Sequence, residues 1–523
     1  MLFSFRVVIF VPLLMHGILA DEVPCSPRQF DQDSTVCVCN STYCDYAGIE
    51  GGGLLFTYFN AFVTTKDGLR LDRQLGSWDD QIQPNKYVFN LGNNTRQTIL
   101  GFGGAFTDSA TMNMNSLSPQ ARANLINSYY GQNGIEYTMG RIPMASCDFS
   151  SRVYSYDDID GDLELKEFAL AEEDLVYKIP AIKDAMKVSK RNVTLFGSPW
   201  SSPFWMKTNN NMTGKGTIKG GPNGQYAKAW ANYFVKFLQG YKQLGLNMWG
   251  LTAQNEPNDG NIDGFPYQCL AFDAESQKNF IANELGPALE QNGFGGVKLM
   301  ILDDERKYLP AWADTVLNDP FAAKYVSGIA VHWYDDMNVP PSVLNDTFKQ
   351  FGDKYFLLNT EACVQDLANK SNTVLLGNWQ RGERYFTDIL QDIENGVSGW
   401  VDWNMALNMQ GGPNWQNNFA DSPVIVNAQT DEFYKQPMFY AMGHFSKFVR
   451  PGSKLIDHTS NLPDDSDLKA IFFTREDDSI AANFVNTNNT TSFDITITDY
   501  RVPGYLNYQI PPKSFVTFIW YRI

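Results

Sequence analysis

The stretch MWGLTAQNEP, residues 248–257, places a glutamate directly after a short apolar run, and YFLLNTE, residues 355–361, repeats the arrangement. Each run is a few residues long and is bounded by polar or turn-forming residues, which is typical of a short buried strand. A carboxylate at the end of such a strand costs free energy unless it is paired or used. On separate strands of one parallel barrel, Glu256 and Glu361 would face each other across a cleft.

Between residue 97 and about residue 403, short apolar runs alternate with longer segments whose apolar residues recur at helical spacing. This alternation is typical of repeated β-α units. We expect eight strands, at residues 98–102, 137–142, 193–197, 248–254, 297–302, 328–333, 355–359 and 397–403. Eight strands with intervening helices predict an α/β fold, a (β/α)8 TIM barrel.

The two ends of the chain have a different pattern. Residues 467–522 alternate apolar and polar side chains in short runs, and residues 54–64 do the same, which indicates antiparallel strands of a sandwich. The predicted domains are an all-β sandwich domain at 51–96 plus 453–523, the barrel at 97–404 plus 437–452, and a small disulfide-containing β subdomain at 21–50 plus 405–436.

Residues 1–20 fit a secretory signal peptide, because one cation, Arg6, precedes an apolar run and Ala20 is a small residue at its end. A membrane anchor is the weaker interpretation, since Pro12 and His16 interrupt the run. The run is also short of the roughly 20 residues that a membrane span needs.

Cysteine usage agrees with export. Of the seven cysteines, four crowd into the stretch after the signal, which predicts two disulfides among Cys25, Cys37, Cys39 and Cys44. Spacing alone does not decide the connectivity; the simplest choice is sequential, Cys25 with Cys37 and Cys39 with Cys44. The scattered cysteines are expected to be buried thiols: Cys147, Cys269 and Cys363.

Several sequons would accept N-linked glycans in a secretory compartment: Asn40, Asn93, Asn192, Asn211, Asn345, Asn369, Asn488 and the overlapping Asn489. A formal net charge of −17 argues against nucleic acid as a partner and fits acidic surroundings, where carboxylate protonation relieves self-repulsion. Neither a His-Glu-x-x-His nor a Cys-x-x-Cys motif occurs in the sequence, so we expect no zinc or other metal.

In a barrel of this type the residues just past each strand gather at one mouth. Carboxylates, rings and amides at these positions suit a neutral, hydroxyl-rich ligand, because carboxylates accept from sugar hydroxyls and rings cover the apolar face of a pyranose. The residues concerned are Asp108, Asp148, Trp200, Asn255, Glu256, His332, Tyr334, Glu361, Asp402, Trp403 and Asn404.

Several of these residues have plainer interpretations. Asp148 would serve equally as a helix N-cap, and Trp200 and Trp403 as core residues. His332 is better explained as a buried histidine hydrogen-bonded to a barrel carboxylate than as a catalytic group. Cys363 points to the same side of its strand as Glu361, but a thiol nucleophile needs a histidine base and oxyanion donors.

The motifs resemble those of the lysosomal glucosylceramidases, acid β-glucosidases that cleave glucosylceramide. They are GFGGA (101–105), RIPMASCDFS (141–150), SPW (198–200), NEP (255–257), AVHWY (330–334), EACV (361–364), GGPNW (411–415) and YKQPMFY (434–440). The resemblance spans essentially the whole mature chain. It implies Glu256 as acid/base and Glu361 as nucleophile, with Tyr334 beside the nucleophile. Further implied roles are binding of the glucose hydroxyls by Asp148, Trp200, Asn255, Trp403 and Asn418, supported by Arg141 and His332.

The chain departs from the family pattern near the mouth. The aromatic types of Phe265 and Tyr267 are exchanged, and the loop at 365–371 differs. Glucose binding is expected to survive both changes, which leave aglycone preference and activator contact open.

Charge alone suggests how the two glutamates divide their roles. Retaining glycosidases hold their carboxyls about 5 Å apart, where one charge disfavours a second by roughly 3 kcal/mol, or about 2 pKa units. We therefore expect Glu256 to hold its proton while Glu361 is ionised and attacks the anomeric carbon. The alternatives are another retaining β-glycosidase, such as a β-xylosidase, and a catalytically inactive sugar-binding homologue. A serine hydrolase is disfavoured because no Gly-x-Ser-x-Gly elbow occurs near a usable histidine.

The resemblance also implies a location and partners. It implies the secretory pathway and the lysosomal lumen, with a secreted enzyme as the alternative, and no cofactor. Glucosylceramide in a membrane must be met at the bilayer surface, so we expect peripheral membrane contact and a mouth ringed by exposed aromatic residues. A saposin-type activator and anionic lipids are the implied helpers.

Overall fold

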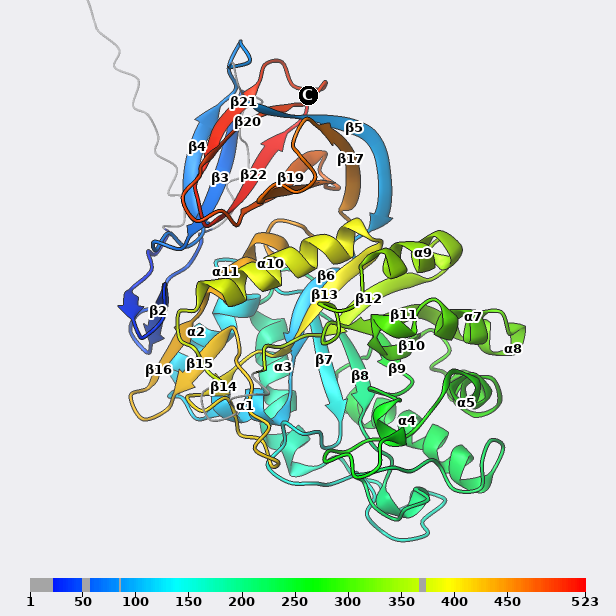
Figure 1. Ribbon diagram of the computed structural model, residues 1–523. Helices are drawn as coiled ribbons and strands as arrows, with labels where there is room; N and C mark the ends of the chain where they lie inside the picture. Colours follow the sequence, from blue (N-terminus) through cyan, green and yellow to red (C-terminus); the bar gives the residue numbers. More distant parts are fainter. Residues whose placement is uncertain (1–21, 49–56, 84–85, 366–372) are drawn as a thin grey trace, which may run out of the picture.

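The computed structural model describes residues 22–48, 57–83, 86–365 and 373–523, which form three sheets and their connecting helices (Figure 1). The predicted signal peptide and the sequon at Asn369 lie outside the described residues. The other sequon asparagines are exposed or half-buried, and their glycosylation stays a prediction.

The central sheet is a closed barrel of eight parallel strands, which confirms the predicted fold class. Its interior is filled by apolar side chains from several strands, including Met139, Phe196, Met300 and Leu358. In chain order the strands are β6 (Gly101–Ala105), β7 (Met139–Met144), β8 (Thr194–Pro199), β9 (Gly250–Thr252), β10 (Lys298–Glu305), β11 (Val326–His332), β12 (Phe356–Glu361) and β13 (Val397–Asn404).

The first barrel strand begins later than predicted. Thr98 belongs to β5 (Tyr87–Thr98) of the sandwich, where it pairs with Lys454. The chain then turns into β6 at Gly101, whose φ of 146° favours glycine, and a Cβ there would lie 2.4 Å from Thr138 Oγ1. The apolar run at 98–102 therefore contains the end of β5 and the start of β6, which is why the strand was predicted to begin too early.

Helices cover the outside of the barrel and bury their apolar faces against it. Their starts follow local rules: Ser118 caps α2 with Pro119 in the first turn, and Asn378 caps α10 by accepting from Arg381 N–H. The helices are α1 (Asp108–Asn115), α2 (Pro119–Tyr130), α3 (Ile179–Val188), α4 (Gln225–Gln243), α5 (Ala274–Phe280), α6 (Gly286–Gln291), α7 (Ala311–Leu317), α8 (Pro320–Ala323), α9 (Ser342–Phe351), α10 (Trp379–Glu394) and α11 (Pro437–Ser446).

The second sheet combines strands from both ends of the chain, in the order β21-β20-β5-β17-β18-β19-β22-β3-β4. It folds over on itself, since Tyr508 of β21 packs against Phe518 of β22, 5.0 Å between ring centroids, although these strands are not hydrogen-bonded neighbours. The predicted sandwich is therefore confirmed. Besides β5, its strands are β3 (Tyr58–Thr65), β4 (Asp72–Ser77), β17 (Lys454–Ser460), β18 (Leu468–Thr474), β19 (Ser479–Asn486), β20 (Phe493–Thr498), β21 (Leu506–Ile510) and β22 (Ser514–Tyr521).

The third sheet carries both predicted disulfides, Cys25–Cys37 and Cys39–Cys44. Strand β2 holds Cys37 and Cys39 and pairs antiparallel with the central strand β16. This pairing joins the start of the chain to the insertion after the last barrel strand. The remaining cysteines are free and buried, as predicted. The strands are β1 (Pro27–Gln29), β2 (Thr35–Asn40), β14 (Leu407–Asn408), β15 (Val424–Asn427) and β16 (Glu432–Lys435).

Helices α10 and α11 lie between the barrel and the sandwich (Figure 1). The ring of Trp379 stacks on Phe515 at 4.6 Å, and Lys513 Nζ lies 3.0 Å from the Glu383 carboxylate, so the sandwich rests directly on a barrel helix. Among the helices of the described residues, none is long and apolar enough to cross a membrane.

Candidate active site

A cavity opens beyond the ends of the barrel strands, and most of the predicted site residues line it. The predicted residues at its wall are Asp148, Trp200, Glu256, Tyr334, Glu361, Trp403 and Asn418. Also at the wall are Asp259, Phe265, Tyr267, Gln268 and Gln365. Three further predicted residues, Arg141, Asn255 and His332, are buried and contact one another or the two glutamates.

Glu361 is the last residue of β12, and its carboxylate is held from two sides. Tyr334 Oη donates to its Oε1 at 2.6 Å, and Arg141 donates to its Oε2. The same guanidinium donates to Asn255 Oδ1 at 2.7 Å and to Asp303 Oδ2 at 2.9 Å. A carboxylate with both oxygens hydrogen-bonded has a fixed orientation, as a nucleophile requires.

Glu256 stands opposite, just past the short strand β9. Its backbone has a φ of 39°, and its N–H donates to the Asp303 carbonyl at 2.8 Å, so the strand neighbour holds this strained residue in place. His332 Nδ1 lies 3.1 Å from Glu256 Oε1, and Nε2 of the same ring lies 3.1 Å from Asp303 Oδ1. An oxygen of Glu256, an oxygen of Glu361 and a ring nitrogen of His332 all lie within 4.8 Å of one another.

The charges differ from the sequence-based expectation. Burial raises the pKa of Glu361 above its usual value, and the charge of Glu256 adds to the rise against the effect of Arg141. Burial also raises the pKa of Glu256, but the hydrogen bond and charge of His332 outweigh it, so this pKa lies below its usual value. Burial lowers the pKa of His332, yet the carboxylates of Glu361, Asp303 and Glu256 raise it well above its usual value.

The contact with His332 therefore favours the ionised form of Glu256. The expectation counted only the repulsion between the two glutamates. The sequence placed His332 beside a barrel carboxylate, but it did not reveal that the ring contacts two carboxylates at once.

Aromatic and polar side chains form another part of the cavity wall. Trp200 and Trp403 stack at 5.0 Å between ring centroids with 17° between planes, and the Arg141 guanidinium lies 4.9 Å from the Trp200 ring. Both tryptophans are buried yet border the cavity. Asn418 Nδ2 donates to Asp148 Oδ2 at 3.5 Å; burial, together with the charges of Glu361 and Glu256, raises the pKa of Asp148 to about 7.

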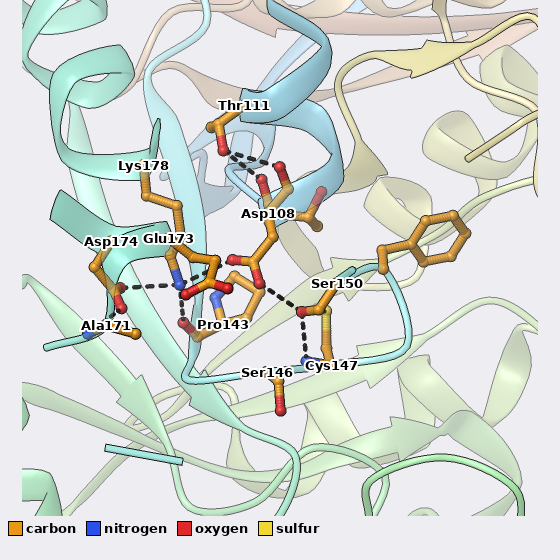
Figure 2. A network of polar contacts seen from close by, with 12 residues as sticks. Asp108, Thr111, Pro143, Ser146, Cys147, Ser150, Ala171, Glu173, Asp174 and Lys178 are labelled. Carbon is orange, nitrogen blue, oxygen red and sulfur yellow. Dashed lines mark hydrogen bonds and ion pairs between the residues drawn. The ribbon is translucent and has the colours of Figure 1, made fainter. Parts of the chain in front are cut away.

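The loop that carries Asp148 is held from behind by a buried ion cluster (Figure 2). Lys178 Nζ lies 3.2 Å from Asp108 Oδ1 and 2.9 Å from Asp174 Oδ1, and all three side chains are fully buried. Asp108 accepts from Ser150 Oγ at 2.6 Å, and Ser150 in turn accepts from the backbone N–H of residue 147 at 3.1 Å. The cluster thus fixes both ends of the turn around Asp148.

Three predicted mouth residues lie away from the cavity. Asp108 belongs to the ion cluster just described. Asp402 accepts from Tyr385 Oη at 2.7 Å, and Asn404 accepts from Thr107 Oγ1 at 2.7 Å. Because successive side chains of a strand point to opposite sides, Trp403 faces the cavity and its two neighbours do not.

Sequence reasoning missed Asp303, which joins Arg141, His332 and Thr360. Asp303 follows the predicted strand at 297–302, so the rule that found the other mouth residues would have found it too. A β-bulge between Leu302 and Asp304 aims it inward, with φ values of 68° at Leu302 and 59° at Asp303. Asp259 and Gln268 were also missed, because they lie on a loop rather than at a strand end.

The expected ring of exposed aromatics is only partly present. Phe265 and Tyr267 border the cavity with rings 5.3 Å apart in a T-shaped contact, and both are half-buried. The exposed apolar side chains on the mouth loops are aliphatic or sulfur-containing: Ile262 is 50% exposed and Met337 is 83% exposed.

Comparison with known proteins identifies the family to which this barrel and sandwich belong. A family model described as the glycosyl hydrolase family 30 TIM-barrel domain matches residues 99–449, and the family 30 beta sandwich domain matches residues 452–518. The chain belongs to glycosyl hydrolase family 30. It is 44% identical over 501 residues to the lysosomal acid glucosylceramidase of Mus musculus, covering 95% of this chain and 96% of that protein.

Two other similar proteins share less sequence identity with this chain. An endo-1,6-beta-D-glucanase of Aspergillus fumigatus is 31% identical over 376 residues, covering 69% of this chain and 72% of that protein. The crystal structure of SrfJ from Salmonella typhimurium superposes with a TM-score of 0.79 at 26% identity, covering 89% of this chain and all of that one. As a family 30 member, the protein is a glycoside hydrolase, and its resemblance to the glucosylceramidases is confirmed.

Proposed function

We propose that the protein is a retaining β-glucosidase that hydrolyses glucosylceramide to glucose and ceramide by double displacement. The observation that carries the proposal is the approach of Glu256 and Glu361 oxygens to within 4.8 Å across a cavity. Retaining glycosidases hold their two carboxyls at about 5 Å, whereas inverting enzymes need a wider gap that admits a water. The 44% identity with a lysosomal acid glucosylceramidase supports this substrate.

The contacts of each glutamate support a separate role for it. Glu361, oriented by Tyr334 and Arg141, attacks the anomeric carbon and forms a glycosyl ester. Glu256 protonates the departing glycosidic oxygen and then takes a proton from the water that hydrolyses the ester. Asp148, Asn418 and the two stacked tryptophans bind the glucose ring, with Asn255 near its 2-hydroxyl.

The proposal extends to the membrane. Ile262 and Met337 project from the mouth loops as exposed apolar side chains, which suits peripheral contact with a bilayer that contains the substrate. The proposed setting is the lysosomal lumen, reached through the secretory pathway, with a saposin-type activator and anionic lipids as helpers. Secretion from the cell is the alternative, and fractionation of cells expressing the full chain with an acid-stable tag distinguishes the two.

A covalent label tests the mechanism. Incubation with a 2-fluoro-glucoside that carries a good leaving group, followed by peptide mapping, is expected to place the label on Glu361. The Glu361→Gln variant should remain unlabelled. Label on any other residue, or no label on an active protein, would contradict the assignment.

Substrate comparison tests the specificity. Glucosylceramide in vesicles, with and without anionic lipid, is expected to be hydrolysed at about pH 5, and β-1,6-glucan and aryl xylosides are expected to react far more slowly. Preferential turnover of the glucan would favour the activity for which the fungal relative is named. Binding of glucosides without turnover would indicate an inactive sugar-binding homologue.

A further inference from the structure

Asp259 is a third carboxyl at the cavity, and the double-displacement mechanism does not use it. It begins a short 3-10 turn (Asp259–Asn261), and its backbone N–H donates to the Glu256 carbonyl at 3.0 Å. This tight turn returns the Asp259 side chain to the cavity that Glu256 lines, where the two carboxyl groups lie within hydrogen-bonding reach of each other. Gly260 is required next to it, because a Cβ there would lie 2.1 Å from the backbone nitrogen of Ala271.

Two carboxyl groups form a hydrogen bond only when a proton lies between them, since two carboxylates offer acceptors alone. The surroundings decide where that proton lies. Burial and the charges of Glu256 and Asp304 raise the pKa of Asp259 to about 10. The cation facing the pair is His332, whose two ring nitrogens already contact Glu256 and Asp303. The titratable groups that face Asp259 are Glu256, Tyr267, Cys269, Asp304, Tyr308 and His332.

We propose that Glu256 and Asp259 share one proton and that Asp259 is a positioning residue that keeps the acid/base supplied with it. This inference rests on the proposed function, because it concerns the proton that the departing glycosidic oxygen receives. In the protein without substrate the shared proton lies on Asp259 and points at the Glu256 carboxylate.

The proton balance closes over one turnover. Asp259 gives its proton to Glu256, and Glu256 passes a proton to the glycosidic oxygen as that oxygen leaves the anomeric carbon and Glu361 bonds to it. Ester formation removes the negative charge of Glu361, so the pair then carries two charges with less repulsion. The attacking water gives a proton to Glu256 while its oxygen replaces Glu361 at the anomeric carbon, and the pair again holds one proton.

The test compares Asp259→Asn, Asp259→Ala and Asp259→Glu with a control, Asp263→Asn, an exposed carboxyl on the same loop. The amide cannot give up its proton, so Asp259→Asn and Asp259→Ala are expected to move the basic limb of the kcat/KM profile to lower pH, by about one unit or more. Asp259→Glu retains a carboxyl and should recover part of the wild-type limb. Asp263→Asn should follow the wild type.

Leaving-group dependence supplies a second readout. Phenyl β-glucoside needs a proton on its departing oxygen, and 2,4-dinitrophenyl β-glucoside does not. Asp259→Asn is expected to slow the phenyl substrate about tenfold or more and the dinitrophenyl substrate by less than about threefold. Thermal unfolding of each variant identifies a loss caused by misfolding, and the Ala and Glu variants then decide the result.

The outcomes separate the two proposals. If the wild type does not hydrolyse either glucoside, or Glu256→Gln leaves hydrolysis of the phenyl substrate intact, the proposed function fails. If both of those behave as expected but Asp259→Asn keeps the wild-type basic limb and slows both substrates equally, the proton-sharing pair is overturned and the proposed function stands.

Discussion

Two buried charge networks lie on either side of the turn that carries Asp148, and they differ in how their charges are balanced. In the ion cluster, Lys178 lies between Asp108 and Asp174, and tyrosine and serine hydroxyls donate to both carboxylates. In the active site, Asp148 and Asp259 border the cavity, where Asp148 accepts from Asn418 and Asp259 lies beside Glu256. The acidic members are Asp148, Glu256, Asp259, Asp303 and Glu361, and the cations are Arg141 and His332.

The difference shows what each network is built to do. A buried cluster in which each carboxylate contacts the lysine and accepts hydroxyl hydrogen bonds is satisfied within the protein, so it serves as a fixed support. Carboxyls that are buried beside other carboxylates at a cavity have raised pKa values and hold their protons more readily. Asp148, whose pKa is raised to about 7, and Asp259, whose pKa is raised to about 10, both belong to the second network.

The strongest test of the comparison is Glu361→Gln. The nucleophile is lost, so kcat/KM for an aryl glucoside is expected to fall by at least about 10³-fold, or about 4 kcal/mol. Burial raises the pKa of Glu361, so its charge opposes folding as pH rises, and the variant should unfold at no lower temperature than the wild type at pH 7. If Glu361→Gln kept its activity or unfolded at a lower temperature than the wild type, the active-site network would not differ from the ion cluster in the proposed way.

Lys178→Met tests the ion cluster. It leaves Asp108 and Asp174 buried without a cation and is expected to lower the free energy of unfolding by about 3–5 kcal/mol in urea denaturation. The two carboxylates raise the pKa of Lys178 against the effect of burial, so its contribution is present below its ordinary pKa. The contribution weakens in acid, because burial raises the pKa of Asp108 and its protonation removes a partner charge. The matched control is Lys183→Met, an exposed lysine of the adjoining helix, which should change little. Equal stability of both variants would contradict a supporting role.

Asp148→Asn tests the pH dependence. The pKa of Asp148 is raised in the folded protein, so its contribution to stability is present below its unfolded pKa and is lost as pH rises towards about 7. The variant is expected to match the wild type in stability at pH 4 and to exceed it at pH 7.5 by roughly 2–4 kcal/mol. Urea denaturation at both pH values measures the difference; parallel curves would contradict it. Affinity for glucosides should fall at the same time.

Arg122→Ala has the smallest expected effect. Arg122 pairs with Asp184 at 2.6 Å between α2 and α3, but Asp184 is 45% exposed, so solvent screens the pair. A loss of about 0.2–1 kcal/mol is expected. If Arg122→Ala lowered the free energy of unfolding as much as Lys178→Met, burial would not explain why the ion cluster stabilises the protein more than a surface ion pair does.

The strand pattern predicted the fold class and most of the site because parallel barrel strands deliver their last residues to one mouth. Glu256, Glu361, Trp200 and Tyr334 all lie there as expected. Asp303 directly follows the predicted strand at 297–302 and was overlooked. The bulge at Leu302, which aims Asp303 inward, depends on pairing between β10 and β11 and cannot be predicted from short-range patterns.

Charge states were the least predictable part of the site. The low pKa of Glu256 depends on contacts with His332 and Asp259, which come from another strand and from a loop turn. The roles of Asp108 and Asp402 were likewise decided by partners on distant helices, Lys178 and Tyr385. Such partners become visible only when the chain is folded.

The sandwich built from both ends of the chain has a consequence for biosynthesis. Strand β5 ends at Thr98, and its neighbour β17 begins at Lys454. At roughly 5–20 residues per second, a ribosome needs on the order of twenty seconds to a minute to make the intervening segment. During that time β5 and the β3-β4 pair lack their C-terminal neighbours β17, β20 and β22, and their edges remain open to wrong pairing. We therefore expect nascent chains stopped before the last strands to be retained by chaperones, even where the barrel is already complete.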